Sequence, residues 1–228
     1  MCIIAIKPQG KKMFNDKQLE TMFINNPDGS GYMYYDKDKK TVVFKKGFMT
    51  LDALKKSLAE KDLTNTNVIL HFRIGTSGYK DTLNCHPYPV YQKNKTEGTT
   101  DLAVAHNGIL HEYTPQRNSD INDTQVFIQT VLSKLKRDFI YDKDKTNLIE
   151  ELIGYNKLAF LDKNNKIKLI GYFIEDGGYI YSNDSYKPKP KPKYTYTPKT
   201  YNECVKIWGQ EFYNDDDIWE YLEAREMK

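Results

Sequence analysis

Three short apolar runs constrain the fold of this chain more than any other sequence feature. They occupy residues 2–7, 67–72 and 102–106 and consist mainly of Ile, Val, Leu and Ala. Runs of this length and composition are typical of strands buried on both faces. Because strand and helix patterns are intermixed without a regular strand–helix–strand alternation, we predict an α+β fold with a largely antiparallel sheet.

Amphipathic patterns and turn residues place further elements along the chain. A polar loop at residues 36–40 separates two strand-like runs and predicts a hairpin. Helices are predicted at residues 15–23, 50–62, 119–137 and 147–153, and further strands at 156–161, 166–172 and 178–181. The 228 residues are enough for one substantial domain with a buried core.

A Lys/Pro-rich segment marks the end of that domain. In Lys187–Lys193 lysine alternates with proline, which excludes a helix or a central strand and predicts an extended linker. A polybasic tether to an anionic surface is the alternative interpretation. We expect a domain at residues 1–184, a linker at 185–199 and a tail at 200–228 with two short helices, the first at residues 200–212.

Charge and cysteine content exclude several classes of protein. The 34 basic and 31 acidic side chains give a net charge of +3 without a wide basic face, which does not indicate nucleic-acid binding. Cys2, Cys85 and Cys204 are far apart and odd in number, so they indicate free thiols and neither a disulfide framework nor a zinc site. Without a secretory signal or a membrane-spanning run, we expect a cytoplasmic protein with no membrane partner.

The second residue is a candidate nucleophile. Removal of Met1 would leave Cys2 as the N-terminus, with a thiol and a free α-amine on one residue. The unperturbed pKa values are about 8.5 for the thiol and about 8 for the amine, so the amine can accept the thiol proton near neutral pH. A small residue after Met1 is also common by chance, so Cys2 alone does not establish catalysis.

Three polar motifs follow later in the chain, at Asn26–Gly31, His71–Thr76 and Ala105–Leu110. Each motif alone has a plain interpretation. The first would be a chain reversal, Arg73 in the second a surface charge, and Asn107-Gly108 in the third a hairpin turn. A polar loop at the end of a stiff strand is also a frequent place for a binding site.

Together with Cys2, these motifs resemble those of the class II glutamine amidotransferases, which are N-terminal-nucleophile (Ntn) hydrolases. Segments 84–87 and 122–125 also resemble family elements, and the resemblance covers roughly residues 2–182. Among relatives, the chain looks most like small stand-alone members from bacteria and phages. The resemblance implies a four-layer αββα sandwich, in which two antiparallel sheets lie face to face, helices lie outside, and Cys2 begins a central strand.

The resemblance also implies a reaction. Cys2 would attack the side-chain amide of glutamine, its own α-amine would accept the proton, and a γ-glutamyl thioester would form and then be hydrolysed, with release of ammonia. The side-chain amide of Asn107 and the backbone N–H of Gly108 would form the oxyanion hole. No metal and no organic cofactor is implied.

Substrate binding is implied at a further set of residues. Arg73 would bind the α-carboxylate of glutamine in a bidentate pair. Asp123 would bind the α-ammonium, with Asp120 as the nearby substitute. Thr76 and His86 would help to line the pocket. Outside the family context, the residues favour a plainer interpretation, with Arg73 as a surface charge and Asp123 as a helix-capping acid.

The chain departs from the family pattern at three positions. Ile3, Ile74 and Ser77 stand where the family usually has glycine, an aromatic residue and histidine. Those positions shape the pocket, so the reaction type transfers better than the substrate. His71 and His106 lie at the ends of apolar strands, and we interpret them as structural.

Two alternatives to glutamine hydrolysis stay open. One is hydrolysis of another γ-glutamyl or small amide compound, and the other is a non-catalytic module that holds a partner through its C-terminal helices. Full-length family members pass ammonia to a fused synthase domain, for which this chain is too short. We therefore expect a separate synthase or acceptor protein, or plain amide hydrolysis.

Overall fold

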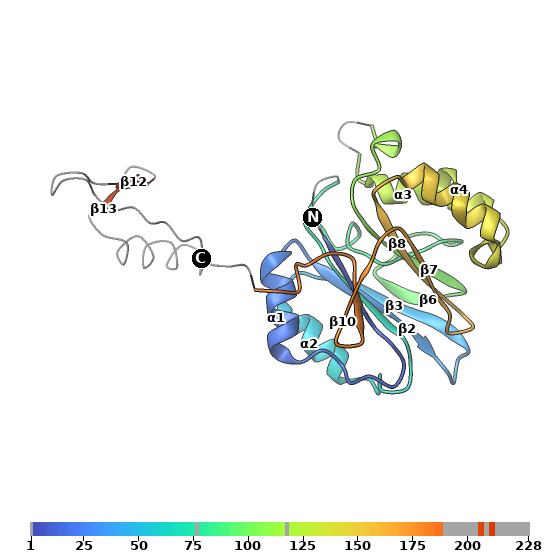
Figure 1. Cartoon of the computed structure of the whole chain (residues 1–228), viewed down its shortest axis with the longest axis horizontal. Helices are drawn as coiled ribbons and strands as arrows, with labels where there is room; N and C mark the ends of the chain where they lie inside the picture. Colours follow the sequence, from blue (N-terminus) through green and yellow to red (C-terminus); the bar gives the residue numbers. More distant parts are fainter. Residues whose placement is uncertain (1, 76–77, 117–118, 189–204, 208–209, 213–228) are drawn as a thin grey trace. The chain divides into compact units, whose positions relative to one another are not determined.

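The computed structural model describes residues 2–75, 78–116, 119–188, 205–207 and 210–212 (Figure 1). The chain divides into two units, Met1–Lys189 and Pro190–Lys228, each compact by itself. Within the described part, no helix is both long and apolar enough to cross a bilayer. The residues of the predicted site, apart from Thr76, all lie in the described part of the first unit.

A seven-stranded antiparallel sheet forms half of the first unit. Its strands are β1 (Ile3–Lys7), β2 (Ser30–Asp36), β3 (Thr41–Phe48), β4 (Val68–Phe72), β6 (Glu97–Thr100), β10 (Ile174–Asp176) and β11 (Tyr179–Tyr181). They are ordered β10-β11-β1-β4-β2-β3-β6. β2 and β3 form the predicted hairpin. β1 pairs with β11 on one side and β4 on the other, so the residue that precedes it is attached to an interior strand.

A second antiparallel sheet packs against the first. Its strands are β5 (Tyr88–Pro89), β7 (Leu102–Asn107), β8 (Lys157–Asp162) and β9 (Ile167–Ile170), in the order β5-β7-β8-β9. Side chains from both sheets form one buried cluster, which includes Ile4, Ile6 and Met33 from the first sheet and Ala103, Ala105 and Ala159 from the second. The short alanine side chains let the two sheets approach closely at this layer.

Helices cover the outer face of each sheet (Figure 1). They are α1 (Asp16–Asn25), α2 (Leu51–Ala59), α3 (Asp123–Thr130) and α4 (Lys143–Ile153), with short 3-10 helices at His111–Tyr113, Leu132–Lys134 and Phe139–Tyr141. α1 and α2 pack on the seven-stranded sheet, and α3 and α4 pack on the four-stranded sheet. The four layers are therefore helix, sheet, sheet and helix, and the predicted α+β sandwich with antiparallel sheets is confirmed.

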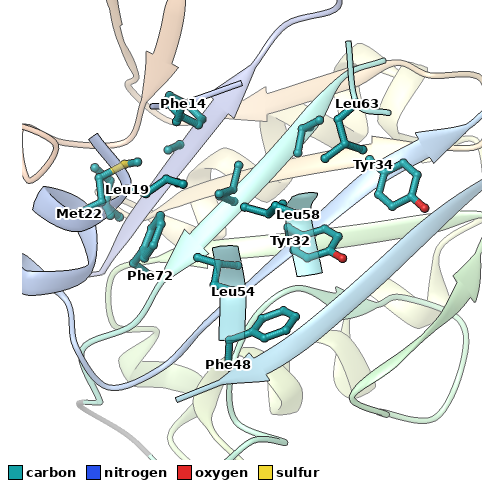
Figure 2. Close-up of a cluster of buried hydrophobic side chains, with 14 of the residues drawn as sticks. Phe14, Leu19, Met22, Tyr32, Tyr34, Phe48, Leu54, Leu58, Leu63 and Phe72 are labelled. Atoms are coloured by element: carbon teal, nitrogen blue, oxygen red, sulfur yellow. The ribbon is translucent and has the colours of Figure 1, made fainter. Parts of the chain in front are cut away.

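The core under α1 and α2 shows how the sequence specifies this packing (Figure 2). Leu54 and Leu58 of α2 lie one turn apart and both contact the sheet, where Tyr32 and Phe48 stack at a centroid distance of 5.8 Å. Each such fully buried side chain contributes roughly 1.5–3 kcal/mol of hydrophobic free energy. Thr50 caps the start of α2, because its side chain accepts a hydrogen bond from the backbone of Ala53.

The predicted helix at residues 119–137 is wrong in length. α3 starts only at Asp123, because the Asn122 side chain accepts a hydrogen bond from the backbone N–H of Gln125 and caps the helix there. It ends at Thr130, whose hydroxyl donates to the carbonyl of Val126. That side-chain bond and two consecutive β-branched residues disfavour continuation of the helix, and the chain goes on in 3-10 turns.

In the second unit, the helix predicted at residues 200–212 is also wrong where the structure describes it. β12 (Val205–Ile207) and β13 (Gln210–Phe212) form an antiparallel pair. Two residues separate the strands in sequence, and the second of them is glycine, which is the composition of a tight hairpin and unfavourable in a helix interior. The helix expected after residue 214 lies outside the described residues.

Candidate active site

Cys2 immediately precedes β1, and its thiol contacts the loop after β4. The backbone N–H of Ile74 donates to Cys2 Sγ at 3.3 Å, and the thiol is 3.4 Å from the Ile74 carbonyl. The Asn183 side chain donates to the Cys2 carbonyl at 2.7 Å. Two segments that lie far away in the sequence therefore hold Cys2 in place at the start of β1. Met1 lies outside the described residues.

Burial raises the pKa of the Cys2 thiol above its ordinary value. The hydrogen bond from Ile74 and the positive charge of Arg73 oppose that shift without cancelling it. At neutral pH the thiol is therefore protonated in this environment, and a nucleophilic attack needs a base to take its proton. Arg73 directly precedes Ile74, so the arginine and the residue that contacts the thiol belong to one segment.

Arg73 is held by the Gly-rich turn as well as by its own strand. Its backbone N–H donates to the Gly29 carbonyl at 2.8 Å, and its carbonyl accepts from Asp28 at 2.9 Å. The Asp28 carboxylate in turn accepts from the backbone of Gly75 at 2.8 Å. The Arg73 side chain is 2 % exposed and donates to the Tyr79 carbonyl at 3.0 Å. The turn at residues 26–31 therefore does more than reverse the chain, and Arg73 is not a surface charge.

Asn107 and Gly108 lie at the end of β7. The Asn107 side chain is 1 % exposed; its Nδ2 is 2.9 Å from Ser182 Oγ, and its Oδ1 has no hydrogen-bond partner. Gly108 has φ +142°, and a Cβ there would lie 1.8 Å from Asn156 Oδ1. The hairpin interpretation of Asn107-Gly108 is wrong, because β7 pairs with β5 and β8 and the chain continues into the 3-10 helix at residues 111–113.

Ser182 connects the Cys2 strand to Asn107. Its hydroxyl accepts a hydrogen bond from the backbone of Ile4 at 2.8 Å and also contacts Asn107. Ser182 and Asn183 follow β11, which pairs with β1. Sequence reasoning missed both residues, since an isolated Ser-Asn after a short strand carries no distinctive signal.

Asp123 is directed toward the segment that follows Gly108. One carboxylate oxygen accepts from the backbone of Leu110 at 2.7 Å, and the other accepts from Thr124 at 2.9 Å. The side chain is nearly buried at 6 % exposure, and as the first residue of α3 it accepts from a backbone N–H of the first helical turn. Asp123 is therefore also an acid at the helix N-terminus, as the helix-capping interpretation predicts. The Asp120 carbonyl accepts from Asn84. Thr76 lies outside the described residues, so its expected role stays a prediction.

Three buried histidines lie together behind these segments. The rings of His71 and His86 have centroids 4.2 Å apart and are tilted by 34°, and the Thr124 hydroxyl lies 2.8 Å from His106 Nδ1 and 3.2 Å from His86 Nε2. His71 Nε2 is 2.9 Å from the His106 carbonyl. In the described part, no group of His, Cys, Asp or Glu side chains is arranged to hold a metal ion. The cluster thus joins three segments of the site without metal-ligand geometry, and the expected contact of His86 with substrate stays a prediction.

Acidification is expected to destabilise the protein through these histidines. Burial lowers the pKa of His71 to about 3, and it lowers the pKa values of His86 and His106 as well. As the pH falls below about 6.5, these histidines take up protons in the unfolded chain but not in the folded chain. Protons therefore favour the unfolded chain, and the free energy of unfolding decreases as the pH falls below that value. His71 alone should cost about 2 kcal/mol between pH 7 and pH 5. Urea unfolding at the two pH values measures this.

A matched pair of variants isolates the cluster in that experiment. His71→Asn should weaken the pH dependence between pH 7 and pH 5, whereas substitution of the exposed His111 by Gln should leave it unchanged. Equal unfolding free energies for the wild type at pH 7 and pH 5 would contradict the assignment.

A hollow of about 410 Å³ lies over a different part of the fold. Its lining comes from residues 88–94 and from α3 with the turn after it, and includes Tyr91, Gln125 and Gln129. Cys2, Arg73, Asn107 and Gly108 do not line it. Because none of these four residues lines the hollow, we locate the candidate active site by its chemical groups.

A sequence comparison connects this geometry to a family. The family model for glutamine amidotransferases class-II matches residues 14–172. The chain belongs to the class II glutamine amidotransferases. The matched region contains Arg73, Asn107, Gly108 and Asp123 and begins after Cys2, so a role for Cys2 as nucleophile rests on other arguments.

Among solved structures, the chain is similar to a glutamine phosphoribosylpyrophosphate amidotransferase from B. subtilis, determined with ADP and GMP. The TM-score is 0.46 at 15 % sequence identity. The similarity covers 80 % of this chain and 42 % of the B. subtilis chain, so the class II amidotransferase described here spans less than half the length of that protein. No curated protein sequence matches this chain significantly.

Proposed function

We propose that this class II amidotransferase hydrolyses the side-chain amide of glutamine through Cys2 after Met1 has been removed. The observation that carries the proposal is the position of the Cys2 thiol, which receives the Ile74 N–H on the loop that also presents Arg73. A nucleophile in contact with the segment that carries a guanidinium suits a substrate that has a carboxylate at one end and a reactive amide at the other.

The proposed reaction has two covalent steps. The α-amine of Cys2 takes the thiol proton while sulfur bonds to the amide carbon, and the proton then goes to the nitrogen as the C–N bond breaks and ammonia leaves. Water next attacks the thioester carbon and restores the thiol with release of glutamate. The raised pKa of the thiol supports this sequence, because a protonated thiol requires the amine as base.

The Asn107–Gly108 segment is the proposed site of oxyanion stabilisation. A tetrahedral intermediate carries negative charge on oxygen, and each preorganised donor aimed at it contributes roughly 3–4 kcal/mol. Support comes from Asn107, which is buried and has an amide end without a hydrogen-bond partner. Arg73 would bind the α-carboxylate and Asp123 the α-ammonium, with two backbone bonds to hold the Asp123 carboxylate in place.

A glutaminase assay with two cysteine variants tests this function. The processed wild type should release ammonia from glutamine, and Cys2→Ala should lower turnover by about 10³-fold or more, as removal of a nucleophile does elsewhere. Cys85→Ala is the matched control, because Cys85 is also a buried thiol but lies against the Asp81 carbonyl. It should retain turnover. Equal rates for Cys2→Ala and the wild type would exclude the proposed reaction.

A further inference from the structure

We infer that Ser182 is a positioning residue that decides which end of the Asn107 amide faces the reacting carbonyl. This inference rests on the proposed function, because it concerns the oxyanion site of that reaction. Ser182 is 1 % exposed and lies at the end of β11, far in sequence from every motif of the family. Its hydroxyl is within hydrogen-bond distance of both the Cys2 strand and Asn107.

The hydrogen bonds of Ser182 determine whether its hydroxyl acts as donor or acceptor toward each neighbour. The backbone N–H of Ile4 donates to Ser182 Oγ at 2.8 Å, and the Ser182 N–H donates to the Ile4 carbonyl at 3.0 Å. These two bonds fix the residue against β1, with its oxygen as an acceptor. A hydroxyl also has one proton to donate. Asn107 lies next to the Ser182 hydroxyl, and its buried Oδ1 has no hydrogen-bond donor among the described residues.

The orientation of the Asn107 amide follows from that proton. With Nδ2 toward Ser182, two N–H groups meet one hydroxyl oxygen, and Oδ1 is buried without a partner. A half-turn of the amide exchanges two groups of nearly equal size. The Ser182 hydroxyl then donates to Oδ1, and the NH₂ takes the position of the unpartnered oxygen. A buried acceptor without a partner costs about 1–3 kcal/mol, and this arrangement avoids that cost.

The same arrangement has a catalytic consequence. An N–H donor at the unpartnered position stabilises an oxyanion, whereas a carbonyl oxygen there repels it. Ser182 therefore acts through Asn107 and does not need to contact the substrate. The neighbouring Asn183 reinforces the geometry, since its Oδ1 accepts from Ser185 and leaves its Nδ2 to bind the Cys2 carbonyl. One dipeptide thus aligns the nucleophile strand and the oxyanion donor.

Steady-state kinetics of the processed full chain test this inference. Ser182→Ala should lower kcat for glutamine by about 10- to 100-fold and leave KM nearly unchanged, because the transition state loses a donor that the ground state does not need. Ser185→Ala is the matched control, since Ser185 bonds to the described residues through its backbone and not through its hydroxyl, and it should behave as the wild type. Alkylation of Cys2 by iodoacetamide, followed on the N-terminal peptide, should keep its rate in Ser182→Ala, because it forms no oxyanion.

A double-mutant cycle separates positioning from a general structural role. In an Asn107→Ala background, Ser182→Ala should cause almost no further loss of kcat, because the amide that it orients is absent. If Ser182→Ala does not fold, Ser182→Cys keeps the size of the side chain with a weaker donor and should show an intermediate loss of kcat. An unchanged kcat, a loss that repeats in full in the Asn107→Ala background, or slower alkylation of Cys2 would overturn the inference. The absence of turnover in the processed wild type would overturn both the proposed function and the inference about Ser182. A wild-type rate in Ser182→Ala would overturn only the role of Ser182.

Discussion

Gly108→Ala is expected to lower kcat for glutamine by about 10²-fold and to destabilise the fold by about 2 kcal/mol or more. At φ +142° an L side chain is strained, and the new Cβ would lie 1.8 Å from Asn156 Oδ1. Asn156 cannot retreat freely, because the same oxygen is 3.0 Å from His106 Nε2. The backbone at Gly108 must therefore move, and with it the N–H proposed to bind the oxyanion. Steady-state kinetics and urea unfolding of the variant measure both effects.

Two companion variants separate the causes of that loss. Gly154→Ala also places alanine at a positive φ, +56°, but its Cβ would meet nothing within 4 Å, so it reports the cost of backbone strain alone and should keep normal kcat. In an Asn156→Ala background the contacts with Oδ1 at 1.8 Å and Cγ at 2.6 Å are gone and the contact with Cβ at 3.1 Å stays, so Gly108→Ala should cost measurably less stability than in the wild type. Equal costs in the two backgrounds would contradict a steric origin.

Arg73→Lys is expected to lower kcat/KM for glutamine by about 10²- to 10³-fold, mainly through KM. A lysine cannot reproduce the planar fork that binds a carboxylate bidentately, and the loss of one partner from a buried charge pair costs about 2–5 kcal/mol. The substitution also removes the donor to the Tyr79 carbonyl, so urea unfolding should accompany the kinetics. Arg137→Lys is the matched control, because Arg137 is an exposed arginine paired with Asp101, and it should change neither parameter.

A truncated substrate identifies the group that Arg73 binds. 4-Aminobutanamide keeps the amine and the amide of glutamine and lacks its α-carboxylate. If Arg73 binds that carboxylate, the wild type and Arg73→Lys should hydrolyse this compound at nearly the same low rate. A difference as large as the one measured with glutamine would assign Arg73 a different role.

The sequence predicts the parts of this fold that depend on local chemistry. The apolar runs at residues 2–7, 67–72 and 102–106 form interior strands because only a two-sided core can accept such segments. Asn15 and Thr50 start helices at the predicted places because capping is decided within four residues. These elements also carry the residues that the motifs single out.

Features that depend on tertiary contacts were not predictable. The shortening of the helix predicted at 119–137 follows from the cap at Asn122, and several polar residues in that segment could have served as caps. The role of Ser182 depends on the pairing of β11 with β1, which brings together residues about 180 positions apart. Val205 and Phe212 form a cross-strand pair in the hairpin of β12 and β13 but also fit a helical spacing, so the hydrophobic pattern alone does not distinguish the two structures.

The proposed mechanism requires a covalent bond between the Cys2 sulfur and the substrate. The most direct test is the mass of the N-terminal peptide after the processed enzyme has been quenched with acid during turnover of glutamine. The proposed mechanism predicts a peptide that begins with Cys2, lacks Met1 and carries one γ-glutamyl group, and it predicts no such adduct in Cys2→Ala. Ammonia release at the wild-type rate by Cys2→Ala, or by a protein that still carries Met1, would contradict it.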